Sequence, residues 1–141
     1  MGIDNEMKVT FSAKSENESF ARVCAAAFVT VLNPTVGDIE DVKTAVSEAV
    51  TNAVIHGYEN TEGVVRMRCV LSGRELMIEI EDDGAGIENI ALAMEPLYTS
   101  RPELERSGMG FTVMEAFMDG IEVESSPGHG TTVRMKKIFN T

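Results

Sequence analysis

Five stretches of the chain alternate between apolar and polar residues, and this period of two predicts strands with one buried face. In the first stretch, Met7, Val9 and Phe11 share one side. In the later stretches the other side carries Arg, Lys or Glu, which is typical of a sheet with one face in water. A fully parallel sheet, buried on both faces, is therefore excluded. The predicted strands are residues 7–13, 65–71, 76–81, 121–124 and 133–136.

Helical patterns fill stretches between the predicted strands, and these helices must cover the single apolar face. We predict an α/β (α+β) two-layer sandwich with a mixed, mostly antiparallel sheet. Ser15 and Glu18 form a capping box that predicts a helix up to about Leu32. Its part from 24 to 31 is apolar on nearly all sides, so both sides should be covered. One side can face the core, and the other either meets a second subunit or is sunk in a deep core.

A polar stripe runs along the helix predicted up to His56, which opens with an acidic turn at Asp38. Glu48, Asn52 and His56 are four residues apart and therefore share one face, while apolar residues occupy the other faces. Such a stripe must face water or a ligand. Gly57 follows directly and is suited to a left-handed cap that ends the helix.

The least regular part of the chain is residues 82–107, and a connection this long in a small domain is usually functional. It begins with Asp82, Gly84 and Gly86 directly after a predicted strand. There the carboxylate can accept a hydrogen bond from an exocyclic amine, and the glycines can keep a wall open for a flat ring. Taken alone, the motif could equally be a simple Asp-Gly turn.

Two more glycines, Gly108 and Gly110, stand at the start of a helix predicted for residues 109–118. Free N–H groups and the positive end of the helix dipole favour a phosphate at such a place. Glycines before a helix are also common turn residues, and the spacing lacks the lysine of a P-loop. This motif, too, is weak evidence when it stands alone.

Composition narrows the kinds of protein and partner. The 141 residues are enough for one domain with its own core, and the formal net charge is −11. That charge would repel nucleic acid and suits a basic protein partner. We expect no membrane span, no secretory signal and, from two cysteines without CxxC spacing, a location in a reducing cytoplasm. No residues are spaced for structural zinc, so a metal would be held by oxygen.

Four motifs in a fixed order make chance a poor explanation. They are ExxxNAxxHG at 48–57, DxGxG at 82–86, GMGF at 108–111 and GTT at 130–132. This order resembles the N, G1, G2 and G3 boxes of the GHKL ATPase and kinase superfamily, which has the Bergerat fold. The resemblance implies a single nucleotide-binding domain for ATP or ADP with Mg²⁺, and an ATP lid at about residues 95–107.

The resemblance also implies a role for each motif residue. Asp82 would bind the adenine amino group, with Thr131 beside it through a water, and Asn52 would hold Mg²⁺. Glu48 would orient or deprotonate the attacking hydroxyl of a phosphoryl transfer. We assign His56 to a structural role at the helix end and His129 to solvent. The other nucleotide-binding positions implied are Gly84, Gly86, Arg106, Ser107, Gly108, Met109, Gly110 and Phe111.

A closer resemblance, to the anti-sigma-F factors of endospore-forming bacteria, rests on residues 17–22 (NESFAR) and 96–110 (PLYTSRPELERSGMG). That family implies a homodimer that inhibits a sporulation sigma factor and phosphorylates a serine of its anti-anti-sigma factor. We place the sigma contact near Arg22. The alternatives are an ATPase clamp, a histidine kinase catalytic domain and an ATP-gated binding module without kinase activity. The ATPase clamp would need a transducer domain, and the histidine kinase would need its dimerisation helices. Glu48 counts against a binding module without catalysis, because such a module needs no carboxylate one turn from a metal ligand.

Overall fold

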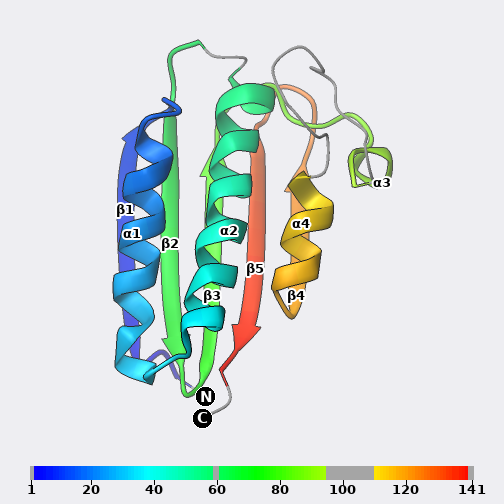
Figure 1. Ribbon diagram of the computed structural model, residues 1–141. Coiled ribbons are helices and arrows are strands. Elements are labelled where there is room, and N and C mark those ends of the chain that lie inside the picture. Colours follow the sequence, from blue (N-terminus) through cyan, green and yellow to red (C-terminus); the bar gives the residue numbers. More distant parts are fainter. Residues whose placement is uncertain (1, 59–60, 95–109, 140–141) are drawn as a thin grey trace.

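The computed structural model describes residues 2–58, 61–94 and 110–139. Its sheet has five strands in the order β1-β2-β3-β5-β4, and within the described chain every neighbouring pair is antiparallel (Figure 1). Because β5 enters between β3 and β4, the end of β3 lies beside the start of β5. The strands are β1 (Asn5–Ser12), β2 (Val64–Ser72), β3 (Glu75–Asp82), β4 (Gly120–Ser125) and β5 (Thr131–Ile138).

Three helices, α1, α2 and α4, cover one face of the sheet (Figure 1), which confirms the two-layer sandwich. α2 lies between the other two and contacts both. Thr35 caps it by accepting the backbone N–H of Asp38 at 3.0 Å. No helix of the described residues is both long and apolar enough to cross a membrane. The helical segments are α1 (Asn17–Val29), the 3-10 turn η1 (Thr30–Leu32), α2 (Val36–Asn52), the π-helical turn η2 (Ala53–Gly57), α3 (Ile90–Ala93) and α4 (Gly110–Phe117).

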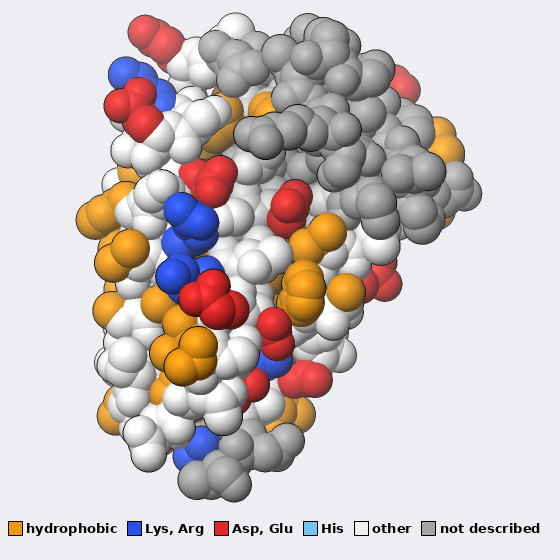
Figure 2. Space-filling model, in the orientation of Figure 1, with side chains coloured by type: hydrophobic (Ala, Val, Ile, Leu, Met, Phe, Trp, Pro, Cys, Tyr) orange, Lys and Arg blue, Asp and Glu red, His pale blue; other side chains and the backbone are white. Residues whose placement is uncertain are grey.

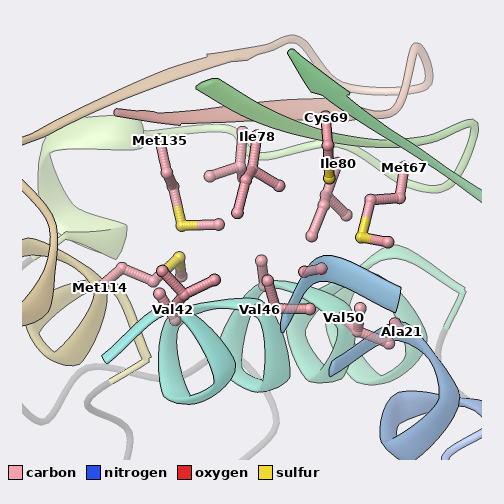
Figure 3. Packing of buried hydrophobic residues seen from close by; sticks show 14 of the residues in the cluster. Ala21, Val42, Val46, Val50, Met67, Cys69, Ile78, Ile80, Met114 and Met135 are labelled. Atoms are coloured by element: carbon pink, nitrogen blue, oxygen red, sulfur yellow. The ribbon is translucent and has the colours of Figure 1, made fainter. Parts of the chain in front are cut away.

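The core lies between α2 and the covered face of the sheet (Figure 3). Val42, Val46 and Val50 point from the helix toward side chains of the strands, among them Ile78 and Met67, and all five are fully buried. Burial alternates along β3 residue by residue. Each such aliphatic side chain stabilises the fold by about 1.5–3 kcal/mol, so the alternation fixes which face of β3 turns to the helices.

The opposite face of the sheet carries ion pairs that cross between strands, as the alternating pattern predicted. Arg66 pairs with Glu81 and Asp83, each at 2.8 Å, and Arg134 pairs with Glu79 at 2.7 Å. These side chains are partly exposed, and such pairs contribute little to stability. This face is a solvated, charged surface.

The capping box predicted at the start of the first helix is wrong. Glu16 is the N-cap and makes no side-chain cap, and Glu18 reaches α2 instead of its own backbone. The Glu18 carboxylate accepts hydrogen bonds from the hydroxyls of Ser47 and Thr51. A tertiary contact with two hydroxyl donors has replaced the local bond.

Helix α1 buries only one of its sides. Ala21 and Val29 are fully buried, whereas Phe20 and Val23 are 54% and 61% exposed. In the view of Figure 2, hydrophobic side chains appear along the edge of the molecule where α1 runs. Within the described chain the deep-core alternative for this helix is therefore wrong, and a second subunit on its exposed side remains a prediction.

Candidate functional site

The central helix changes its hydrogen-bonding pattern inside the predicted polar stripe. α2 ends at Asn52, and the turn that follows is π-helical, closed by the N–H of Tyr58 on the carbonyl of Ala53 at 3.0 Å. Glu48 and Asn52 lie on α2 and are half-buried, while His56 lies in the π turn. Because a π turn holds more residues than an α turn, the regular stripe ends at Asn52.

Gly57 closes this turn, but its predicted left-handed conformation is wrong. Gly57 is not one of the described glycines with a positive φ. Among the described non-glycine residues, the left-handed conformation occurs at Asn33, which follows η1. Gly57 is small for another reason, because a Cβ there would lie 2.8 Å from Oδ1 of Asp82. Its carbonyl also accepts the N–H of Ala85 at 2.7 Å. The end of the central helix thus packs directly against the DxGxG segment.

Asp82 ends β3 on the covered face of the sheet and is only 5% exposed. Its carboxylate accepts the backbone N–H of Gly84 at 2.9 Å, and the backbone N–H of Thr131 on β5 is close enough to lower the pKa of Asp82. Burial raises the pKa of Asp82 to about 6, although the two N–H groups act in the opposite direction. Since a carboxylate has about four acceptor positions, Asp82 can accept a further donor from a ligand.

Glycines keep the space around Asp82 free of side chains. A Cβ on Gly84 would lie 2.0 Å from the carbonyl oxygen of Gly57, and one on Gly130 would lie 2.0 Å from the carbonyl oxygen of Asp82. Gly130 also has a φ of +77°, which favours glycine. The ends of the central helix and β3 and the start of β5 therefore meet at backbone distance, and the backbone forms the wall beside Asp82.

Gly86, the last glycine of DxGxG, contacts a neighbouring turn and not this wall. Its φ is +79°, and a Cβ on it would lie 2.0 Å from the carbonyl oxygen of Ser126. One residue earlier, the carbonyl of Ala85 accepts the N–H of Gly128 at 2.7 Å. The small size of Gly86 thus lets the DxGxG segment close onto the turn between β4 and β5.

Ser125, at the end of β4, is a site residue that the sequence analysis missed. Its hydroxyl accepts the N–H of Ile87 at 2.8 Å, donates to the carbonyl of Gly130 at 2.7 Å and lies 2.9 Å from Oγ1 of Thr131. It therefore ties the segment after DxGxG to the GTT motif and fixes the Thr131 hydroxyl. A lone serine at a strand end has no sequence pattern that could have revealed this. His129, in the adjoining turn, is exposed as predicted.

Asn52 faces the start of α4. A Cβ on Gly110 would lie 3.0 Å from both Nδ2 and Oδ1 of Asn52. Gly110 and Phe111 are buried, and the first N–H groups of a helix have no partner within that helix. The structure thus brings the second residue of the polar stripe to the second glycine of GMGF. Arg106, Ser107, Gly108 and Met109, with the lid predicted for about 95–107, lie outside the described residues.

The oxygen donors of this region fit Mg²⁺ held mainly through a bound phosphate chain. The carboxamide of Asn52 offers one oxygen, and Mg²⁺ commonly takes one or two protein ligands beside phosphate oxygens and waters. In the part of the chain that the structure describes, no three His, Cys, Asp or Glu side chains form a group that could hold a metal by themselves. A metal at Asn52 would therefore depend on a bound nucleotide for its other ligands.

Known proteins are similar in sequence over almost the whole chain. The family model of the histidine kinase-like ATPase domain matches residues 11–137. The anti-sigma F factor of Clostridium acetobutylicum is 66% identical over 137 residues, which cover 97% of this chain and 96% of that protein. The anti-sigma F factor of Clostridium kluyveri is 64% identical over 138 residues (98% and 97%). That of a Thermoanaerobacter species is 57% identical over 141 residues (100% and 99%).

A solved structure has the same fold. The crystal structure of the RsbU and RsbW domains of a Mycobacterium tuberculosis protein matches with a TM-score of 0.69 at 20% identity, covering 96% of this chain and 32% of that chain. Identity this low shows a common fold alone. The family model and the nearly full-length relatives show more: the chain belongs to the histidine kinase-like ATPase domain family and, within it, to the anti-sigma F factors.

Proposed function

We propose that the protein is an anti-sigma factor and an ATP-dependent serine kinase of the matching anti-anti-sigma factor. The observation that carries the proposal is the approach of Asn52 to Gly110, with Glu48 one turn before Asn52 on the same helix. An oxygen ligand for Mg²⁺, a carboxylate and a helix N-terminus thus belong to one region. In-line phosphoryl transfer needs positioning and charge neutralisation above all, and these groups can supply both.

Asp82 would recognise the adenine base. Its desolvated carboxylate has acceptor positions beyond the one used by the N–H of Gly84 and can accept the exocyclic amine. Thr131 lies directly opposite Asp82 in the register of β3 and β5, so both side chains are on one face of the sheet. The Thr131 hydroxyl, held by Ser125 at 2.9 Å, would join the base through a water.

The phosphates would lie at the start of α4, where the backbone N–H groups of Gly110 and Phe111 would bind their oxygens. Asn52 would hold Mg²⁺, which when bound neutralises phosphate charge. Glu48 would take the proton of the attacking serine hydroxyl as the bond from the serine oxygen to the γ-phosphorus forms and ADP leaves. The remaining proposed contacts come from the lid at about 95–107 and from Arg106, Ser107, Gly108 and Met109.

The proposed partners follow from the family and from the surface. The relatives are named anti-sigma F factors, and a net charge of −11 suits a basic sigma factor better than nucleic acid. The exposed side of α1, with Phe20 and Val23, would contact a second copy of the chain. Arg22 on the same helix would take part in partner binding, and Arg22→Glu should then change the affinity for at least one partner. Such a protein would act in the cytoplasm.

The decisive experiment adds γ-labelled ATP, Mg²⁺ and the anti-anti-sigma protein to the wild type and to Glu48→Gln. We expect label on a partner serine with the wild type and its loss with Glu48→Gln, while both bind ADP equally. Glu40→Gln is a matched control, because Glu40 lies two turns earlier on α2 and is exposed. It should label the partner as the wild type does.

Other outcomes would point elsewhere. Equal labelling by the wild type and Glu48→Gln would remove Glu48 as the base. Release of labelled phosphate to water, without labelled partner, would favour the ATPase clamp. Nucleotide binding with neither product would favour the ATP-gated binding module.

A further inference from the structure

Glu18 joins α1 to α2, the helix that carries Glu48 and Asn52. Its Oε1 accepts the hydroxyl of Ser47 at 2.9 Å, and its Oε2 accepts the hydroxyl of Thr51 at 3.2 Å. All three side chains are partly buried. Ser47 and Thr51 are four residues apart, so they form one line along α2, and a single carboxylate on α1 spans that line.

The two hydroxyls stand directly before the two residues proposed to act in phosphoryl transfer. Ser47 precedes Glu48, and Thr51 precedes Asn52. Successive residues on an α-helix are about 100° apart, so the anchored line faces α1 while the adjacent line turns toward the site. A carboxylate that holds Ser47 and Thr51 therefore also limits rotation and sliding of Glu48 and Asn52.

Arg22 connects this bridge to the surface proposed for partner binding. Its Nε lies 3.8 Å from Oε1 of Glu18, too far for a hydrogen bond, and it is shielded from solvent with no hydrogen-bond partner. Its Nη2 donates to Ser19 at 3.1 Å. A buried donor without a partner is unfavourable, so Arg22 can gain a bond by moving toward Glu18. The Glu18 carboxylate is thus within reach of donors on two sides, the hydroxyls of α2 and the guanidinium of Arg22.

We propose that Glu18 is a positioning residue for phosphoryl transfer and that it links Arg22 to Glu48 and Asn52. When an acidic group of a partner pairs with Arg22, Glu18 stays on Ser47 and Thr51 and holds α2 in place. When Arg22 closes the 3.8 Å gap to Glu18, it draws the carboxylate away from α2, so the hydroxyl bonds lengthen and α2 is freer to shift. This inference rests on the proposed function, because it assigns Glu18 to the same site.

Glu18→Ala is the first test, with two readouts. One is kcat and KM for ATP with the partner, and the other is the ratio of ADP dissociation constants without and with Mg²⁺. Loss of a group that orients a metal ligand commonly costs about 10–100-fold. We expect kcat to fall at least about tenfold and the Mg²⁺ ratio to fall toward one, while ADP affinity in EDTA changes less than about twofold.

Three further variants separate positioning from mere packing. Glu18→Gln keeps a group that can bond both hydroxyls, and it should retain kcat within about twofold. Ser47→Ala combined with Thr51→Val should reproduce the loss, and adding both to Glu18→Ala should cause no further loss. Glu16→Ala is the matched control at the N-cap of α1, since Glu16 is exposed and makes no side-chain cap, and it should leave both readouts unchanged.

Several results would overturn the inference. Unchanged kcat and Mg²⁺ ratio in Glu18→Ala would show that Glu18 does not position α2, and equal weakening of ADP with and without Mg²⁺ would show a general structural role. Additive losses in the combined variant would exclude the route through Ser47 and Thr51. If the wild type itself transferred no phosphate, the proposed function would fail, and the Mg²⁺ ratio would still decide whether Glu18 positions Asn52.

Discussion

Asp82 and Asp83 are neighbours in the sequence, yet they occupy opposite environments. Asp82 lies on the helix side of the sheet, where burial raises its pKa to about 6. Asp83 lies on the open side and accepts two hydrogen bonds of 2.8 Å from the guanidinium of Arg66, which holds the pKa of Asp83 below its usual value. Strand alternation thus turns Asp82 to the buried face, where it is available for a ligand, and turns Asp83 to the open face, where it pairs with Arg66.

The two carboxylates also differ in the rigidity of what surrounds them. Backbone atoms of three segments enclose Asp82, and glycines make their approach possible. Asp83 is 65% exposed and meets a long, flexible side chain. Substitutions near Asp82 should therefore have large effects on folding and ligand binding, and substitutions near Asp83 small ones.

The largest effect is expected for Gly84→Ala. The added Cβ would lie 2.0 Å from the carbonyl oxygen of Gly57, so backbone must move, and we expect a loss of about 4 kcal/mol in the free energy of unfolding together with loss of ADP binding. Urea unfolding and calorimetric titration would measure both. Gly120→Ala is the control, because a Cβ there meets nothing within 4 Å. Equal stability of the two variants would show that the wall beside Asp82 is not rigid.

Asp82→Asn should separate binding from stability. ADP affinity should fall about 100-fold, because a hydrogen bond to a charged group contributes about 1.5–3 kcal/mol. The free energy of unfolding at pH 7 should rise by about 1–2 kcal/mol. A pKa raised from 3.8 to about 6 corresponds to a cost of at most about 3 kcal/mol for the buried charge. The amide removes this cost but also weakens a hydrogen bond to a backbone N–H, so the net gain is smaller.

Asp83→Asn is the matched control for Asp82→Asn. It should leave ADP affinity unchanged, because Asp83 points away from the helices and pairs with Arg66. Undiminished ADP binding by Asp82→Asn would falsify the assignment of Asp82 as the acceptor for the base.

The pH dependence of ADP binding provides a third, smaller effect. As the pH falls through about 6, Asp82 becomes protonated and loses acceptor strength, so affinity at pH 5 should be about tenfold below its value at pH 7. Asp82→Asn should show no such slope. The stability difference between the two proteins should be present above pH 6 and should vanish near pH 4, because a raised carboxyl pKa penalises only the charged folded form. Calorimetry across this range would check both slopes.

Arg66→Met should have the smallest effect. Exposed ion pairs contribute about 0.2–1 kcal/mol, so the free energy of unfolding should fall by less than about 1 kcal/mol, and the difference should shrink in 1 M salt. ADP affinity should not change. A loss of ADP binding in this variant would mean that the open face communicates with Asp82, contrary to the separation described above.

The sequence was sufficient to predict the layers because each strand has its own periodic pattern. The alternation that buries Ile78 and Ile80 continues to Asp82, so the period of two also predicts that this carboxylate lies on the buried face of the sheet. The family resemblance placed Asn52 and Gly110 in one predicted nucleotide site; in the structure a Cβ on Gly110 would lie 3.0 Å from the Asn52 carboxamide, and the binding roles of both residues stay a prediction. Local patterns could not show that Glu18 bonds hydroxyls 29 and 33 residues away. Nor could they show that Gly57 is small because Asp82 touches it.

The π turn after α2 sets the direction in which Gly57, its last residue, faces. Asn52 must meet Gly110 before the turn, and Gly57 must meet Asp82 after it. An uninterrupted α-helix with the same number of residues would turn Gly57 by about 100° and place a residue with a side chain against the carboxylate. The π turn therefore lets the same helix place Asn52 against Gly110 and Gly57 against Asp82. The number of residues in that turn matters as much as their identity.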